Sequence, residues 1–217
     1  MSTVALIDYG SGNLRSAEKA LVEAARRSRA GHEVTVTYDP DAVARADRIV
    51  LPGVGAFAAC RSLLMARSGL VEALTEAVKA RGAPFLGVCV GMQLLATRGL
   101  EFGETPGLDW IGGEVRRIEP ADHALKVPHM GWNALAPGHA HALLRGEAAD
   151  RDLGHMYFTH SYALHADDAS DVIAWTDHGG PIVAAVARDN VAGVQFHPEK
   201  SQARGLKLLG DFLEWRP

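Results

Sequence analysis

A cysteine flanked by two glycines is the strongest chemical feature of the sequence. Residues 84–96 read PFLGVCVGMQLLA, with Cys89 between Gly87 and Gly91. This spacing has the pattern G-x-nucleophile-x-G, which is typical of a nucleophile elbow, a sharp turn from a strand into a helix. Glycines give the backbone room at such a turn, and the amino end of the following helix favours a thiolate. The pattern predicts a nucleophilic Cys89, although most free cysteines are small buried core residues.

A histidine and a glutamate follow a later strand-like run and could activate such a thiol. The stretch VQFHPEKS places His197 directly before Pro198, and Glu199 directly after it. A residue before proline is biased toward extended backbone, in which positions two apart point the same way. We therefore predict that the imidazole pairs with Cys89 while Glu199 orients the imidazole. Taken singly, a surface histidine and an acidic residue near a helix start are the simpler interpretations.

Strand-like and helix-like runs alternate through the first half of the chain, and this order would position those residues. The pattern is typical of an α/β fold, a parallel sheet covered by helices on both faces. Strands are predicted at residues 4–8, 33–38, 48–53 and 84–88, and helices at 14–24, at 56–81 with a break near 68–69, and at 90–99. Further strands are predicted at 111–118, 156–164, 171–176, 181–187 and 191–196, before a final helix over about 201–214.

The carboxyl ends of parallel strands are where function gathers in open sheets. The stretches YGSGN, PGVG and GVCVG all follow predicted strands, and HPEKS follows the last one. We find no linker or internal repeat, so we expect one domain over residues 1–217.

Composition excludes several classes of protein. The chain has 217 residues, of which 47% are hydrophobic and 22% charged, which is ordinary for a globular protein. Its net charge of −4 and its scattered basic residues argue against a nucleic-acid partner. No long apolar run occurs, and Cys60 and Cys89 are the only two cysteines. We expect a cytoplasmic protein without membrane contact, in which Cys60 lies on a helix and is buried in the protein core.

These motifs together resemble the class I (triad) glutamine amidotransferases, which take ammonia from the side chain of glutamine. GVCVGMQLL and QFHPEKS carry the general resemblance. LPGVGAF, VPHMGWN and the HSY of FTHSY narrow it to the glutaminase subunits of imidazole glycerol phosphate synthase. The resemblance covers nearly the whole chain and implies the class I glutamine amidotransferase-like, flavodoxin-like fold, with additional antiparallel strands in the second half. It implies neither a cofactor nor a metal.

The resemblance also implies roles for particular residues. Cys89 would attack the amide carbon of glutamine, His197 would protonate the departing ammonia, and water would hydrolyse the resulting thioester while Glu199 orients the histidine. The residues implied around the substrate glutamine are Gly55, Gln93, Glu101, Ser161 and Tyr162.

An oxyanion site is implied at main-chain groups. Its donors would be the backbone N–H of Val90 and one from the Gly53–Val54 peptide. Relatives often carry leucine where Val90 stands, which leaves a main-chain donor unaffected. Glycines on both sides of Val54 suggest that its peptide can turn in or out. Ala96 and Thr159 occupy positions where relatives often have bulkier apolar side chains, a difference that concerns the local packing and not the chemistry.

A partner is implied as well, because free glutaminase activity would waste glutamine. The resemblance points to a (β/α)8-barrel cyclase that forms a heterodimer with this chain and receives its ammonia. Asn13, Trp132, Tyr157 and Lys200 are implied to face it. The cyclase would produce imidazole glycerol phosphate and an aminoimidazole carboxamide ribotide, which feed histidine and purine synthesis.

Two ligand sites are disfavoured by the spacing of their residues. Gly10 and Gly12 fit a dinucleotide fingerprint, but Arg15 stands at the third glycine position and no phosphate-binding loop motif occurs. His139 and His141 lack further zinc ligands at characteristic spacing.

Three other functions stay open at this point. A stand-alone cysteine hydrolase of γ-glutamyl amides would be active without a partner. A non-catalytic subunit would have no need of Cys89, His197 and Glu199. An amidotransferase for another acceptor would share the triad but differ in the stretch KVPHMGWN.

Overall fold

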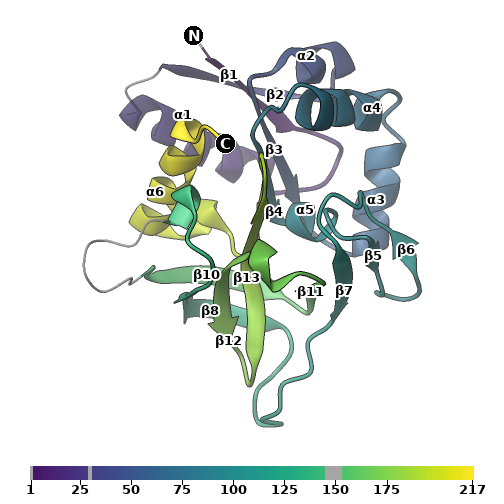
Figure 1. Cartoon of the computed structure of the whole chain (residues 1–217), viewed down its shortest axis with the longest axis vertical. Coiled ribbons are helices and arrows are strands. Elements are labelled where there is room, and N and C mark those ends of the chain that lie inside the picture. Colours follow the sequence, from purple (N-terminus) through teal and green to yellow (C-terminus); the bar gives the residue numbers. More distant parts are fainter. Residues whose placement is uncertain (1, 29–30, 145–152) are drawn as a thin grey trace.

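An eight-stranded sheet forms the centre of the computed structural model, which describes residues 2–28, 31–144 and 153–217 (Figure 1). Its strand order is β2-β1-β3-β4-β14-β13-β12-β9. The parallel strands are β1 (Ser2–Ile7), β2 (His32–Thr37), β3 (Arg48–Gly53), β4 (Phe85–Cys89) and β14 (Val191–Val194). The antiparallel strands are β13 (Pro181–Arg188), β12 (Val172–Asp177) and β9 (Ala136–Pro137). A mostly parallel α/β sheet with antiparallel additions from the second half is therefore confirmed.

Helices cover both faces of this sheet (Figure 1). On one side α1 (Leu14–Arg27) packs against α6 (Gln202–Glu214), and on the other lie α2 (Pro40–Arg45), α3 (Phe57–Met65) and α4 (Leu70–Thr75). The predicted break near Gly69 is confirmed, since this residue has a φ of 76° between α3 and α4. A π-helical turn, Glu76–Ala80, completes the predicted run. The helix α2 was not predicted from the sequence, although Asp39 caps it by accepting a hydrogen bond from the Asp41 backbone N–H at 3.1 Å.

Two smaller sheets correct the prediction of one strand over residues 156–164. The run breaks at Ser161 into β10 (His155–His160) and β11 (Tyr162–Ala166), which join different sheets. β10 pairs with β8 (His129–Ala134), a strand that the sequence analysis did not predict, and β11 pairs with β7 (Gly113–Arg117). The second of these sheets is completed by β5 (Arg98–Gly99) and β6 (Thr105–Pro106). The break places Ser161 between the two sheets.

The helix after the elbow is shorter than predicted. It is α5 (Val90–Gln93), whereas the apolar periodicity predicts a helix that continues to Gly99. The carbonyl groups of residues 94–97 would accept hydrogen bonds from a further helical turn, but they accept them from the backbone N–H groups of residues 107–111. A returning loop therefore ends the helix. Four residues give local N–H groups but little macrodipole, so the predicted helix contribution to the thiolate is smaller.

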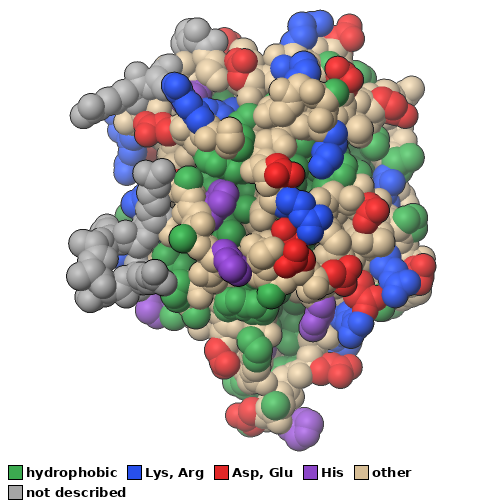
Figure 2. All heavy atoms as spheres, in the orientation of Figure 1, with side chains coloured by type: hydrophobic (Ala, Val, Ile, Leu, Met, Phe, Trp, Pro, Cys, Tyr) green, Lys and Arg blue, Asp and Glu red, His purple; other side chains and the backbone are tan. Residues whose placement is uncertain are grey.

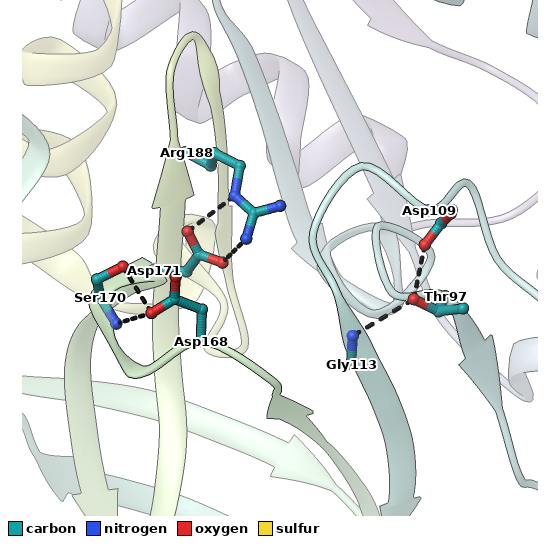
Figure 3. A network of polar contacts seen from close by, with 7 residues as sticks. All are labelled: Thr97, Asp109, Gly113, Asp168, Ser170, Asp171 and Arg188. Carbon is teal, nitrogen blue, oxygen red and sulfur yellow. Dashed lines mark hydrogen bonds and ion pairs between the residues drawn. The ribbon is translucent and has the colours of Figure 1, made fainter.

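Polar contacts hold this loop and the last hairpin in place (Figure 3). Thr97 donates its hydroxyl to Asp109 at 2.6 Å and accepts from the Gly113 backbone N–H at 3.4 Å. Arg188, at the end of β13, donates from Nε to Asp171 Oδ1 at 3.0 Å, and the Asp171 side chain is only 6% exposed. The Thr97 contacts fix the returning loop beside α5, whereas the Arg188–Asp171 pair lies at the opposite edge of the sheet, where Arg188 pairs with Val191 at the start of β14.

Charged side chains of both signs are interspersed on the face shown in Figure 2. Within the described residues, none of the helices has the length and apolar character needed to cross a bilayer.

Candidate active site

The turn after β4 has the geometry of a nucleophile elbow. Cys89 has φ 56° and ψ −114°, a conformation that a non-glycine residue rarely adopts. A Cβ on Gly87 would lie 2.5 Å from the carbonyl oxygen of Gly91, and a Cβ on Gly91 would collide with the backbone of Leu51. The predicted reason for both glycines is confirmed. The elbow leaves Cys89 4% exposed at the carboxyl end of the sheet.

His197 and Glu199 meet beside this elbow, as the HPE spacing predicts. His197 Nδ1 lies 2.8 Å from Glu199 Oε1, and both side chains are almost fully buried. β14 runs parallel to β4, so the residues after each strand reach the same edge of the sheet. The local reason differs from the prediction in one respect. His197 is extended, but Glu199 lies in a 3₁₀ turn, Pro198–Lys200, that brings its carboxylate back toward the imidazole.

The electrostatics favour a charged imidazole. Burial is the largest single influence on the pKa of His197 and lowers it, but hydrogen bonding and charge from Cys89 and Glu199 outweigh burial and raise the pKa to about 9. His197 Nε2 is buried and has no hydrogen-bond partner among the described residues that meets ordinary geometric limits. That nitrogen is therefore the one available to Cys89 and to a leaving group.

A cavity of about 340 Å³ opens over the thiol. This volume lies in the range of about 300–1,000 Å³ typical of small-molecule sites. It brings together Cys89, His197, Val90, Val54, Gly55, Gln93, Glu101, Ser161, Tyr162 and Lys200 from the predicted set, along with Pro128, Thr159 and His160. Glu199 stands behind His197 and does not line the cavity. Gly53, Asn13, Trp132 and Tyr157 are also absent from the lining.

The Val54 backbone N–H, one of the predicted oxyanion donors, is already engaged by a side chain. Its N–H donates to Ser11 Oγ at 3.1 Å, and its carbonyl accepts from the same hydroxyl at 2.8 Å. The Cys60 thiol donates to that carbonyl at 3.3 Å and lies 3.3 Å from Ser11 Oγ. Burial raises the pKa of Cys60, which keeps the thiol protonated as a donor. We call Ser11 and Cys60 the Val54 clasp.

Cys60 is buried, as predicted, but it is more than a core residue. The sequence gives no signal for its bonds to Val54, because helical spacing alone predicts burial. The same holds for Ser11, which lies in the loop after β1 and reaches Val54 through tertiary contact.

Tyr162 contributes its carbonyl to a hydrogen-bond hub on the cavity wall. This oxygen accepts from Gln93 Nε2 and from His160 Nδ1, each at 2.9 Å. Gln93 Nε2 also donates to Gln195 Oε1 at 3.0 Å. Both Gln93 amide hydrogens thus point inward, so only its carbonyl oxygen is available to a substrate.

Two histidines that the sequence analysis did not select extend the hub. Because His160 Nδ1 donates to a carbonyl, its Nε2 must accept, and His129 Nδ1 donates to it at 3.0 Å. His129 Nε2 then accepts from Asn133, also at 3.0 Å. Burial lowers the pKa of His129 to about 4 and that of His160 to about 3. Both rings are neutral at pH 7, and each has one defined tautomer.

Glu101 has a structural contact besides its place on the cavity wall. Its Oε2 accepts from the backbone N–H of Phe57 at 2.7 Å, at the start of α3. Ala56 precedes this helix and offers no side-chain cap, so Glu101 satisfies one of the unpaired N–H groups.

Three of the predicted partner-facing residues form one cluster at the rim. Trp132 and Tyr157 are register neighbours in β8 and β10, with ring centroids 6.1 Å apart. Lys200 Nζ lies 5.6 Å from the centre of the Tyr157 ring. Trp132 is 48% exposed. Asn13 is exposed at the start of α1 and lines a small void with His197 and Glu199.

Known proteins resemble this chain along its whole length. The family description "Glutamine amidotransferase class-I" matches residues 5–214. A Caulobacter vibrioides protein named imidazole glycerol phosphate synthase subunit HisH is 64% identical over 217 residues, 100% of both chains. A Brucella suis protein of the same name is 56% identical over 214 residues, 99% of each chain. A crystal structure of a glutamine amidotransferase has a TM-score of 0.67 at 19% identity and covers 97% of both chains. The chain therefore belongs to the class-I glutamine amidotransferase family, and within it to the group that contains these HisH subunits.

Proposed function

We propose that this chain is the glutaminase subunit of an imidazole glycerol phosphate synthase, built as one glutamine amidotransferase domain. The arrangement of Cys89, His197 and Glu199 under a cavity of about 340 Å³ is the observation that supports it most directly. The names of the relatives supply the reaction to which the ammonia contributes.

In the proposed reaction the Cys89 thiolate attacks the side-chain amide carbon of glutamine. The oxyanion that forms needs two donors, and we assign them to the backbone N–H groups of Val90 and Val54. The imidazolium of His197 gives its Nε2 proton to the leaving amine, which departs as ammonia. His197 then takes a proton from water, which attacks the thioester, and the electron pair of the C–S bond returns to sulfur as glutamate is released.

The Val54 clasp gives a physical reason for low activity in the isolated chain. While Val54 donates to Ser11, only one of the two proposed oxyanion donors is available. A partner that turns this peptide toward Cys89 would complete the site. Removal of one oxyanion donor costs about 10²–10³ in kcat in a well-studied protease, so the gain on turning is expected to be large.

The proposed partner is a (β/α)8-barrel cyclase that forms a heterodimer over the rim of the cavity. Trp132, Tyr157 and Lys200 supply an aromatic and basic cluster there, and we assign Asn13 to the same interface. Within the complex, ammonia would react with a ribotide to give imidazole glycerol phosphate and an aminoimidazole carboxamide ribotide. We place the complex in the cytoplasm.

Glutamate release by the purified chain tests the proposal. It is measured alone, with a cyclase subunit, and with the cyclase plus its ribotide, using Cys89→Ala as the blank. Strong stimulation that disappears in Cys89→Ala, while added ammonia still supports cyclisation, is the expected result. Equal activity with and without the cyclase would favour the stand-alone γ-glutamyl hydrolase. Stimulation only by another acceptor enzyme would favour a different amidotransferase.

A further inference from the structure

A buried amide lies beside the nucleophile and has no role in the triad. Gln195 follows β14, two residues before His197, and none of its surface is exposed. Its Nε2 donates to Cys89 Sγ at 3.7 Å, and its Oε1 accepts from Gln93 at 3.0 Å. Gln195 therefore supplies a side-chain donor to the sulfur, whereas His197 Nε2 makes no hydrogen bond of ordinary geometry with the described residues.

The orientation of this amide follows from the hydrogen-bond network. The partners of an amide group determine which of its two terminal atoms is the nitrogen and which is the oxygen. The Tyr162 carbonyl can only accept, so the Gln93 atom that contacts it must be the nitrogen. That nitrogen also contacts Gln195, so the Gln195 atom facing it must be the oxygen. The nitrogen of Gln195 is then left to face Cys89 Sγ, because a flipped amide would place two N–H groups against each other.

We propose that Gln195 is a further catalytic side chain, whose N–H donates to the Cys89 sulfur while the sulfur carries negative charge, and that Gln93 is a positioning residue for it. The proposal rests on the proposed function for its catalytic consequence. A hydrogen bond to a charged group is about twice as strong as one between neutral groups, and it is not weakened by water in a fully buried site.

The charge on sulfur appears at two points in the reaction. It is present before the thiolate attacks glutamine, and it returns when the C–S bond of the thioester breaks and the electron pair goes back to sulfur. In the thioester itself the sulfur is neutral. Gln195 transfers no proton in either step, so it differs from His197 and acts through its fixed N–H dipole.

Alkylation of Cys89 by iodoacetamide tests the proposal without requiring glutamine turnover. The rate is measured against pH for the full chain, and the Cys89 and Cys60 peptides are resolved by mass spectrometry. Gln195→Glu places a carboxylate oxygen against the sulfur, and we expect the pH midpoint of Cys89 alkylation to rise by at least about one unit, a tenfold change in the thiolate equilibrium. Gln195→Met removes the donor without adding charge, and a smaller rise is expected.

Gln202 gives the matched control, because it is an exposed glutamine at the start of α6. Gln202→Glu adds the same charge to the chain and should leave the midpoint unchanged. If Gln195→Glu does not fold, Gln195→Met decides alone. A wild-type midpoint in a folded Gln195→Met variant would overturn the proposal.

The outcome separates this proposal from the proposed function. If the alkylation midpoint rises in Gln195→Met but the chain never hydrolyses glutamine, the contact with sulfur is supported and the proposed glutaminase function is refuted. If a partner stimulates hydrolysis but the midpoint in Gln195→Met is unchanged, the glutaminase function is supported and the role of Gln195 is refuted. Where both hold, kcat should fall in Gln195→Met while the KM for glutamine changes little.

Discussion

The backbone N–H of Val54 donates to the Ser11 hydroxyl at 3.1 Å, and the same hydroxyl donates back to the Val54 carbonyl at 2.8 Å. Ser11→Ala removes both contacts and makes this orientation of the peptide less favourable. One hydrogen bond is worth about 1 kcal/mol, so glutamine hydrolysis without a partner should rise about fivefold or more. Steady-state glutamate release from the isolated chain measures it.

Ser62→Ala is the control for this change, since Ser62 is exposed on α3. It should keep the activity of the unmodified chain. Unchanged or lower activity in a folded Ser11→Ala variant would contradict a restraining role for the Val54 clasp.

The His197 imidazole should titrate near pH 9, because Cys89 and Glu199 raise its pKa above the ordinary 6.5 against the effect of burial. In Cys89→Ala only Glu199 remains to raise the pKa of His197 against the lowering effect of burial, so the titration midpoint should fall by at least one unit. A raised pKa in the folded state stabilises the fold fully below pH 6.5, and this contribution is lost as the pH rises through about 9. NMR titration of the ring measures the midpoint, and identical values in both proteins would refute the coupling.

The pair His129 and His160 should make the fold sensitive to acid. Burial lowers the pKa values to about 4 and about 3, so the unfolded chain binds more protons than the folded chain below pH 6.5. The contribution of these two neutral histidines to the free energy of unfolding is therefore complete above pH 6.5 and declines as the pH falls toward 3. Urea unfolding at pH 7 and pH 5 should show a smaller pH dependence in His129→Leu than in the unmodified chain.

His129→Leu should also lower stability at pH 7, because His160 Nε2 loses its donor in a buried site. An unpaired buried group costs about 1–3 kcal/mol. His123→Leu provides the comparison, since His123 is exposed, and should leave the unfolding curve unchanged. Equal stability of His129→Leu and His123→Leu at pH 7 would argue against the assigned tautomers, and equal pH dependence would argue against the lowered pKa of His129.

Trp132 should anchor the partner, because it is 48% exposed at the rim and packs against Tyr157. Truncation of an aromatic hot spot costs about 2 kcal/mol or more, so Trp132→Ala should weaken binding to the cyclase about 30-fold. Calorimetric titration gives the Kd. Met65→Ala is the control, because Met65 is 53% exposed at the end of α3 farthest from the rim. If Trp132→Ala and Met65→Ala weaken the affinity for the cyclase equally, Trp132 does not contribute to the interface.

The parts of the site that were predictable depend on short-range spacing. The glycines around Cys89 and the HPE order around His197 predict a conformation and a neighbour within a few residues, and the parallel sheet brings both to one edge. Gln195 and His160 could not be assigned in this way. Their partners come from other strands, and which atoms meet depends on register and on the break at Ser161.

The shortened α5 illustrates the same limit for the fold. Apolar periodicity through residue 96 is compatible with a helix, and nothing local indicates that residues 107–111 return to occupy its carbonyl groups. The strand β8 was not predicted either, because Gly131 interrupts the run HMGWNA and its apolar side chains, Met130 and Trp132, are exposed instead of forming a buried face.

The most direct test of the account is the site of the covalent intermediate. The complex is incubated with glutamine, quenched with acid, and its peptides are mapped by mass spectrometry. The account predicts a glutamyl adduct on the peptide that carries Cys89 and none on the peptide that carries Cys60. An adduct on Cys60, or continued hydrolysis by Cys89→Ala, would contradict it.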